Sequence, residues 1–260
     1  MAQTITSREN ERVKYAGRIA LSAAFRAGEG VFFAEGVRLC EDLAQSLSAR
    51  TVFATPQQLA ALPKVLAAAA EVYEINDSVC QKLAQTQSPQ GLFCLFEMPC
   101  HTLETADFTG GTLVCEAVQD PANVGALLRS AAGLGMAAVL LGPGCADPFA
   151  PKALRAAMGA AGRIPVVTGC PLRQAAAALK AAGATVYAAA AEGALPLYEA
   201  SARLPFALLV GNEGAGLSEE ALALAQKSVC IPMKAGVESL NVAAAAAVLM
   251  YRLLEDAVPG

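Results

Sequence analysis

Two stretches near the end of the chain decide its fold: Leu209-Val-Gly-Asn-Glu-Gly-Ala-Gly-Leu217 and Ile231-Pro-Met-Lys-Ala-Gly-Val-Glu-Ser-Leu-Asn-Val242. In the first, an apolar run typical of a buried strand leads directly into a glycine-rich polar loop. The second follows shortly afterwards, and its polar loop leads into an alanine-rich helix. Two such loops can build one pocket largely from backbone N–H and C=O groups, as a small polar cofactor requires. The pattern therefore favours an enzyme over a purely structural protein.

The composition excludes a disordered chain, because 55% of the 260 residues are hydrophobic and only 16% are charged. This length admits one large domain or two modest ones. The sequence has no N-terminal apolar signal segment and no apolar run of about 18 residues, so we expect a cytoplasmic protein without a membrane partner. A net charge of −4 argues against general nucleic-acid binding but leaves room for a local basic patch.

The cysteines do not have the spacing of a metal site. The chain has eight of them, but no Cys-x-x-Cys pair, and His101 is the only histidine. We therefore expect no metal, and reduced, mostly buried thiols.

The first part of the chain, residues 1–98, has the alternating pattern of a small layered α/β domain. Helices are expected at residues 8–27, 36–47 and 56–70, and strands at 31–34, 51–54, 72–75 and 92–96. The periodicity is lost over residues 99–111, which begin with a proline and end with paired glycines and are expected to form a linker.

The second part, residues 112–260, is expected to form a larger α/β domain. Strands are expected at 112–117, 138–141, 166–168, 185–189, 207–210 and 228–231, and helices at 123–133, 151–159, 171–182, 218–224 and 240–254. Short strands that are apolar throughout are typical of a parallel sheet covered on both faces. Ligands bind such sheets beyond the carboxyl ends of the strands, where this chain carries its polar loops.

A first polar segment, Gln119-Asp-Pro-Ala-Asn-Val-Gly-Ala-Leu-Leu-Arg129, begins where a strand is expected to end. Asn123 is expected to cap the following helix, with backbone N–H groups facing any bound anion. Arg129 lies well around the helix from Asn123, so a substrate using both would have to span the helix start and its side. Taken alone, the segment is explained as readily by an N-cap and a solvated arginine.

The glycine-rich loop is a second polar segment. Its three glycines allow positive φ and close approach of the backbone to a ligand. It is not the dinucleotide fingerprint, which needs Gly-x-Gly-x-x-Gly after the first strand. A plain turn before a Ser218 N-cap would explain the glycines, but Glu213, a carboxylate between turn glycines, has no obvious packing role.

The third segment is the loop before the alanine-rich helix. Ser239 or Asn241 could simply cap that helix. In a functional reading, Ile231, Met233 and Leu240 present backbone polar groups and apolar walls to an adenine ring.

Together, in this order and spacing, the three segments resemble the SpoU (TrmH) family of the SPOUT superfamily, which are S-adenosylmethionine-dependent RNA ribose 2′-O-methyltransferases. The resemblance covers residues 112–255. The first hundred residues, with Ile5-Thr-Ser-Arg-Glu-Asn10, Glu35-Gly36 and Ser88-Pro-Gln-Gly91, resemble the substrate-binding domain that often precedes the family's catalytic domain and is similar to small ribosomal RNA-binding proteins.

The resemblance implies a mostly parallel sheet with helices on both faces, a deep trefoil knot, S-adenosylmethionine bound within the knot, and a homodimer. It assigns the cofactor contacts to Leu209, Gly211, Asn212, Gly216, Ile231, Met233, Leu240 and Asn241. It assigns the catalytic group to Asn123, Arg129, Glu213, Ser239 and Asn241. We prefer Arg129 as a clamp on a neighbouring phosphate rather than as a base, because the very high pKa of a guanidinium keeps it protonated and disfavours proton abstraction.

The RNA substrate is expected to be ribosomal RNA ahead of transfer RNA, by family analogy alone. The run of basic residues that family members often carry after the first helix is missing, since residues 20–27 are mostly apolar. RNA contact is therefore expected to rest on a few charges: Arg8, Lys14, Arg38, Lys152, Arg155 and Arg163.

Two alternatives stay open. A base N-methyltransferase of the same superfamily is disfavoured by the joint presence of Asn123 and Arg129. An RNA-binding protein without turnover is disfavoured by intact Glu213, Ser239 and Asn241.

Overall fold

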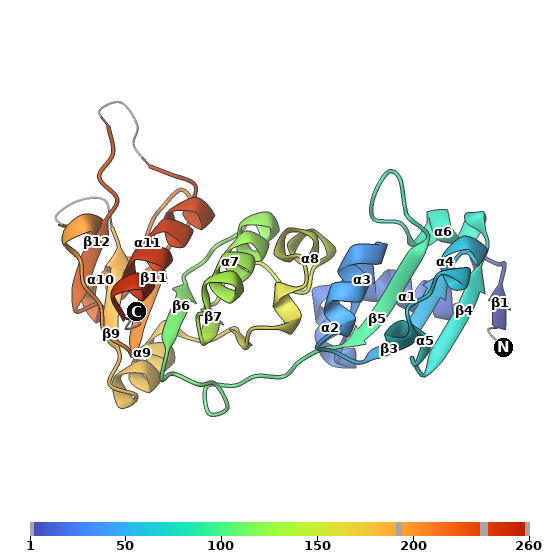
Figure 1. Cartoon of the computed structure of the whole chain (residues 1–260), viewed down its shortest axis with the longest axis horizontal. Coiled ribbons are helices and arrows are strands. Elements are labelled where there is room, and N and C mark those ends of the chain that lie inside the picture. Colours follow the sequence, from blue (N-terminus) through green and yellow to red (C-terminus); the bar gives the residue numbers. More distant parts are fainter. Residues whose placement is uncertain (1–2, 191–193, 235–238, 258–260) are drawn as a thin grey trace. The chain divides into compact units, whose positions relative to one another are not determined.

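A computed structural model of the chain describes residues 3–190, 194–234 and 239–257 (Figure 1). The chain divides into two compact units: Met1–Pro99 with Pro148–Gly162, and Cys100–Asp147 with Arg163–Gly260. The segment of residues 148–162 thus counts with the first unit, although the chain on both sides of it belongs to the second. The domain boundaries expected from the sequence stay a prediction.

The first unit is built on a five-stranded sheet with the order β1-β4-β3-β5-β2. Its strands are β1 (Gln3–Ile5), β4 (Glu71–Ile75), β3 (Ala49–Ala54), β5 (Leu92–Glu97) and β2 (Val31–Glu35). The β1, β4 and β3 strands are parallel, and β5 runs antiparallel to both β3 and β2. The short β1 strand was not expected from the sequence.

The helices of this unit are shorter than the sequence pattern suggests. Residues 8–27, expected as one helix, form α1 (Glu11–Leu21) and α2 (Ala23–Glu29), because Ser22 is extended and its Oγ accepts from the Phe25 N–H at 3.2 Å. The unit also contains α3 (Val37–Ala44), α4 (Pro56–Ala60), α5 (Lys64–Ala67) and α6 (Asp77–Leu83). The single helix expected at residues 56–70 is divided into α4 and α5, with Pro63 as the N-cap of α5, and α6 was not expected.

The core of the first unit follows the period-two alternation of its strands. Phe33, Phe53 and Tyr73 point to the face covered by α1, where they join one buried cluster. Phe32 points the other way and packs against Phe96 and Phe149, with ring centroids 5.7 and 5.1 Å away. Phe149 is therefore part of this core, which explains why its segment counts with the first unit.

The second unit is built on a seven-stranded sheet with the order β10-β12-β9-β11-β6-β7-β8, and every paired neighbour is parallel. The strands are β6 (Gly111–Cys115), β7 (Ala138–Leu141), β8 (Val166–Thr168), β9 (Thr185–Ala189), β10 (Leu195–Pro196), β11 (Phe206–Val210) and β12 (Lys227–Cys230). The expected fold, an α/β protein with a smaller α/β domain ahead of a mostly parallel sheet, is confirmed. The trefoil knot stays a prediction.

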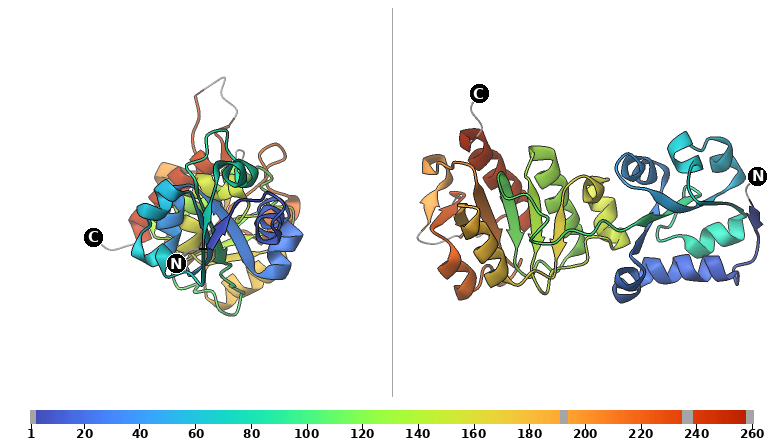
Figure 2. Two further views of the ribbon diagram at one scale, coloured as in Figure 1. Left: turned by 90° about the vertical axis from the view of Figure 1, so that its right-hand side faces the viewer. Right: turned by 90° about the horizontal axis from the view of Figure 1, so that it is seen from below.

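Helices cover both faces of this sheet (Figure 2). On one face, α9 (Leu172–Ala181) and α10 (Glu219–Leu224) bury Ala175, Leu179 and Ala221 against the strands. On the other face, α7 (Pro121–Leu134) packs beside α11 (Val242–Ala257). The helix α8 (Pro151–Ala157) lies in the segment of residues 148–162, which counts with the first unit. The packing of α11 on α7 brings the end of the third polar segment, at Asn241, close to the first polar segment.

All eight cysteines are free thiols, and five are buried, as the sequence predicts: Cys40, Cys80, Cys94, Cys115 and Cys170. In the part of the chain that the structure describes, none of the helices has both the length and the apolar character needed to cross a membrane.

Candidate active site

A cavity of about 700 Å³ lies at the carboxyl ends of β9, β11 and β12. Its described lining consists of residues 210–217, 229–233 and 239–242, together with Ala189, Ala190, Ala245 and Leu249. The second and third polar segments, which together with the first are called the three motifs below, therefore meet around one cavity, as the sequence predicts. Its size falls within the range of about 300–1,000 Å³ that is common for small-molecule sites.

The glycine-rich loop closes tightly on itself at the cavity wall. Asn212 and Gly216 exchange two backbone hydrogen bonds of 2.9 Å. A Cβ added to Gly211 would overlap the carbonyl group of Gly216, so no other residue fits without moving the backbone. Gly216 itself has a φ of +71°, in the left-handed region that favours glycine. Two of the glycines are thus required by the loop geometry.

The Asn212 side chain holds this loop in shape. Its Oδ1 accepts from the N–H groups of Gly214 and Ala215 at 2.9 and 3.0 Å. Its Nδ2 donates to the Ala117 carbonyl at 2.9 Å, just beyond the end of β6. Asn212 was expected to contact the cofactor, and it also braces the loop that lines the cavity.

A second brace, Glu116, was missed in the sequence. Its carboxylate accepts from the Ser218 N–H at 2.8 Å and from the Ser218 hydroxyl at 2.6 Å. The same hydroxyl accepts from the Ala221 N–H, so Ser218 caps α10 as predicted. The only signal in the sequence is an acidic residue directly after a buried strand.

A chain of side-chain hydrogen bonds joins the three motifs. The Glu213 carboxylate accepts from Asn123 Nδ2 at 2.9 Å, and Asn123 Oδ1 accepts from Asn241 Nδ2, also at 2.9 Å. Glu213 further accepts from the backbone N–H groups of Gln119 and Asp120 at 3.3 Å. The structure thus brings together three of the five residues assigned to catalysis.

The surroundings of Glu213 keep it ionised. Burial alone would raise the pKa of its carboxyl, but the hydrogen bonds from Asn123 and from backbone N–H groups outweigh this and hold the pKa below its ordinary value. The carboxylate is therefore a hydrogen-bond acceptor at neutral pH and not a proton donor.

Asn123 does not cap the helix, and the sequence-based expectation was wrong on this point. The N-cap of α7 is Asp120, whose side chain accepts from the Ala122 N–H at 3.0 Å, and Pro121 is the first helical residue. Proline is well suited to that position because its missing N–H would have no helical partner there. The earlier start frees the Asn123 amide to bond Glu213 and Asn241.

The other residues assigned to catalysis stand apart from this network. Arg129 is exposed on α7, and within the described part of the chain it forms no hydrogen bond or ion pair. Ser239 lines the cavity and likewise bonds no described residue.

Most residues assigned to the cofactor line the cavity. Ile231, Met233 and Leu240 do so, and the Met233 and Leu240 side chains are 38% and 40% exposed. Leu209 is the exception, because its side chain is 2% exposed within the sheet core. The next residue, Val210, lines the cavity instead.

The six basic residues assigned to RNA have different surroundings. Arg8 and Arg38 are exposed, and Lys14 pairs with Glu9 and Glu11 at 3.3 and 3.1 Å. Lys152 and Arg163 are exposed and have partners of their own. Arg155 is half-buried, and its Nη1 is buried without a hydrogen-bond partner. They therefore do not form one patch of free cations. Among the described residues, no group of three or more His, Cys, Asp or Glu side chains could hold a metal ion.

Two family models match the chain. The SpoU rRNA Methylase family matches residues 111–251, and the MRM3-like substrate binding domain matches residues 10–94. The 23S rRNA (guanosine(2553)-2′-O)-methyltransferase RlmP of Bacillus subtilis is 34% identical over 249 residues, which cover 96% of this chain and 98% of that relative.

Solved structures of RNA methyltransferases are also similar to this chain. The AdoMet-bound rRNA methyltransferase from Sinorhizobium meliloti is 26% identical with a TM-score of 0.86, covering 96% of this chain and 97% of that one. A structure described as giving insights into 2-OH methylation of C/U34 on tRNA is 33% identical with a TM-score of 0.52, and covers 58% of this chain and 97% of that one. Because the first family model spans more than half of the chain and the B. subtilis relative aligns along almost all of it, this chain belongs to the SpoU rRNA methylase family.

Proposed function

We propose that this protein transfers the methyl group of S-adenosylmethionine to a ribose 2′-hydroxyl of ribosomal RNA. The observation that carries the proposal is the Asn241–Asn123–Glu213 chain of hydrogen bonds, which joins all three motifs beside the cavity. The B. subtilis relative is named for 2′-O-methylation of 23S rRNA, and the S. meliloti structure holds AdoMet.

The cavity fits this cofactor. Polar backbone of the glycine-rich loop faces one side, and apolar Val210, Ile231, Leu240 and Leu249 face the cavity from other segments. This mixture suits a ligand that has both an adenine ring and a charged amino-acid end. Because Gly211 has no room for a Cβ, the loop keeps its shape only with glycine there. When bound, S-adenosylmethionine supplies an electrophilic methyl group on a sulfonium.

The polar network would orient the reacting hydroxyl. Asn123 uses one amide N–H toward Glu213 and one lone pair toward Asn241, which leaves one donor and one acceptor for a ribose. Glu213, held ionised, fixes the orientation of this amide. The preorganised dipoles stabilise charge that develops on the attacking oxygen.

Arg129 would act on the substrate side. Its guanidinium is exposed and has no partner in the described part of the chain, so it is available to a phosphate of the bound RNA. A planar guanidinium binds a phosphate through two parallel hydrogen bonds and thereby places the neighbouring ribose. This contribution is positional, in keeping with the gain from orienting two reactants.

Ribosomal RNA is favoured over transfer RNA by how much of this chain each matched protein covers. The B. subtilis relative, named for 23S rRNA, matches both units of this chain. The structure named for tRNA matches only 58% of it. The first unit is therefore shared with the relative that acts on ribosomal RNA.

We further propose a homodimer, a knotted catalytic unit and a cytoplasmic location. The exposed face of α11 supports the dimer, since Val248 and Tyr251 are 44% and 60% exposed on a helix otherwise packed against α7. Large apolar side chains exposed side by side are typical of an interface.

The test is methyl transfer to purified ribosomal RNA from radiolabelled S-adenosylmethionine, followed by digestion to nucleosides and mass spectrometry. We expect a 2′-O-methylnucleoside from the wild type and at least a hundredfold less from Asn123→Ala. A base-methylated nucleoside would contradict the proposed position of methylation. No transfer, with intact S-adenosylmethionine binding by calorimetry, would contradict the enzyme activity.

A further inference from the structure

The first unit contains a second cavity, of about 590 Å³, which no motif in the sequence predicted. It lies between α1 and the starting ends of β3 and β4. Its lining comes from α1, Arg50, Thr51 and Phe53 of β3, and Ala70, Glu71 and Leu95. With the exception of Leu95, all of these residues fall in the range that matches the substrate-binding-domain model.

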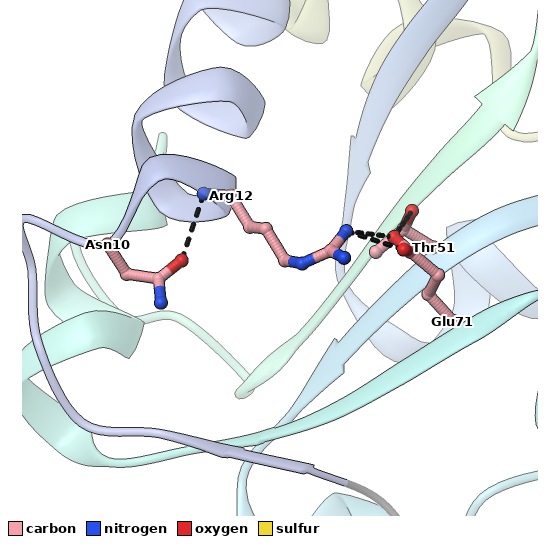
Figure 3. Close-up of polar contacts among 4 residues, drawn as sticks. All are labelled: Asn10, Arg12, Thr51 and Glu71. Atoms are coloured by element: carbon pink, nitrogen blue, oxygen red, sulfur yellow. Dashed lines mark hydrogen bonds and ion pairs between the residues drawn. The ribbon is translucent and has the colours of Figure 1, made fainter.

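A fixed polar group forms one wall of this cavity. Arg12 Nη1 bonds both oxygens of Glu71 at 2.5 and 2.6 Å, and Thr51 Oγ1 donates to the same carboxylate at 3.3 Å (Figure 3). Asn10 fixes the start of α1 by accepting from the Arg12 N–H at 2.9 Å. Both bonds leave from Nη1, the guanidinium lies 4.9 Å from the centre of the Tyr73 ring, and Nε and Nη2 have no hydrogen-bond partner in the described part of the chain.

Two further arginines line the cavity without a counter-ion. Arg18 and Arg50 are exposed, and neither forms an ion pair with any described residue. The Arg18 guanidinium lies 3.9 Å from the centre of the Phe25 ring, which limits its orientations. Lys14, by contrast, is already paired with Glu9 and Glu11. Unpaired arginines are notable in a chain with a net charge of −4.

The same cavity offers groups that suit a nucleobase. The Tyr15 ring lines it, packed edge-on against Phe25 with centroids 5.6 Å apart. The carboxylates of Glu11 and Glu71 are already bonded to Lys14 and to Arg12 with Thr51, respectively, but a carboxylate has further lone pairs that can accept from an exocyclic amino group. Single-stranded RNA is recognised by such combinations of aromatic or guanidinium faces with hydrogen bonds to base edges.

We propose that this cavity binds one unpaired nucleotide of the substrate RNA, with Arg18 and Arg50 on its phosphates and Tyr15 beside its base. The proposal rests on the proposed function, because it takes the RNA to be the methylation substrate. In this unit the proposal therefore assigns RNA contact to Arg18, Arg50 and Tyr15. From the sequence, the residues expected in this role were Arg8, Lys14 and Arg38. The cavity would fix an unpaired segment while the second unit methylates a ribose elsewhere.

The test uses the full-length protein and a fluorescein-labelled single-stranded RNA oligonucleotide of mixed sequence, with anisotropy measured over a series of KCl concentrations. The variants are Arg18→Gln, Arg50→Gln and the double variant. Lys82→Gln is the matched control, because Lys82 is exposed in the same unit, loses the same charge and does not line the cavity. Thermal melting verifies that each variant is folded.

We expect the double variant to bind the oligonucleotide about tenfold more weakly, with the control unchanged. The slope of log K against log[salt] should fall by about 0.7 for each phosphate of the single strand that the variant no longer neutralises. In methylation assays the KM for ribosomal RNA should rise while the KM for S-adenosylmethionine stays the same.

Unchanged affinity and salt slope in the double variant would overturn the proposal, as would weaker binding with an unchanged slope. The two proposals fail separately. A wild type that methylates ribosomal RNA while the double variant behaves identically refutes only the cavity. A wild type that binds the oligonucleotide through these arginines but transfers no methyl group refutes only the methyltransferase activity.

Discussion

The Asn241 side-chain amide donates to the Asn123 Oδ1 at 2.9 Å, although the two residues lie 118 positions apart in the chain. Asn241 Oδ1 in turn accepts from the Ala243 and Ala244 N–H groups in the first turn of α11. One side chain thus fixes the start of α11 and also orients the amide that holds Glu213. Helix position and site geometry are therefore coupled.

Replacing Asn123 by Ala should raise the pKa of Glu213 toward its ordinary value, because it removes a hydrogen bond that lowers this pKa. A carboxyl with a depressed folded-state pKa contributes stability above its unfolded pKa, and the contribution is lost as the pH falls through the folded value. The loss begins near the unfolded pKa in both proteins, but in Asn123→Ala it should be smaller and should be complete at a higher pH. Carbon-detected NMR titration of the Glu213 carboxyl measures the shift. Ser239→Ala is the control, since Ser239 lines the same cavity and bonds no described residue; an equal shift there would contradict the assignment.

Gly211→Ala should abolish S-adenosylmethionine binding. The added methyl would overlap the Gly216 carbonyl group, so the loop that lines the cavity must open. Calorimetry should show at least a hundredfold weaker binding. Gly133→Ala in α7 has no atom within 4 Å of the added methyl, and it should keep wild-type affinity with stability unchanged or up by about 1 kcal/mol. Wild-type affinity in Gly211→Ala would show that the cavity is not the cofactor site.

Glu116→Gln should weaken S-adenosylmethionine binding by roughly tenfold without any direct contact to the cavity. The substitution removes one charged acceptor from Ser218, and charge-assisted hydrogen bonds are worth about 1.5–3 kcal/mol. Hydrogen exchange should show faster opening at residues 212–218. Glu219→Gln, in the same helix start and without a described partner, is the matched control. Equal effects of the two substitutions would contradict a specific brace.

Arg129→Lys should lower kcat/KM for ribosomal RNA by about tenfold to a hundredfold while S-adenosylmethionine affinity stays unchanged. Lysine keeps the charge but cannot form the two parallel hydrogen bonds of a guanidinium to a phosphate. Steady-state kinetics with each substrate varied in turn separates the two effects. Near-normal turnover in the variant would refute the clamp.

Tyr251→Glu should convert the proposed dimer into monomers in size-exclusion chromatography with light scattering. Tyr251 is 60% exposed on α11, and a carboxylate buried there without a partner would be costly. Leu21→Glu serves as the control, because Leu21 is 78% exposed on a helix of the other unit. A wild type that is monomeric at micromolar concentration would refute the dimer directly.

Local patterns were enough to locate six of the seven strands of the second unit; the two-residue β10 was not expected. β7, β8 and β9 have the bounds expected from the sequence, because each is a short apolar run set off by polar, glycine or proline residues. The first unit was harder. Ser22 divides a continuous helical pattern, and its side chain stabilises a new helix start in preference to another turn of α1.

The candidate site, too, could be predicted from the sequence only in part. Gly211 and Gly216 could be predicted to need glycine, since the constraint lies within one tight loop. The role of Glu116 could not, because its partner Ser218 is 102 residues away and only strand order brings them together. The predicted N-cap role of Asn123 was wrong for a local reason, because Asp120 and Pro121 form a better helix start three residues earlier.

The segment of residues 148–162 restricts how this protein can be dissected. Cutting the chain after Pro99 would leave Phe149 and Leu154, now 4% and 1% exposed, on a C-terminal fragment that lacks Phe32 and the rest of their core. The N-terminal fragment would carry the complementary apolar face uncovered. We expect each half to aggregate when expressed alone, and the halves to become soluble when they are co-expressed.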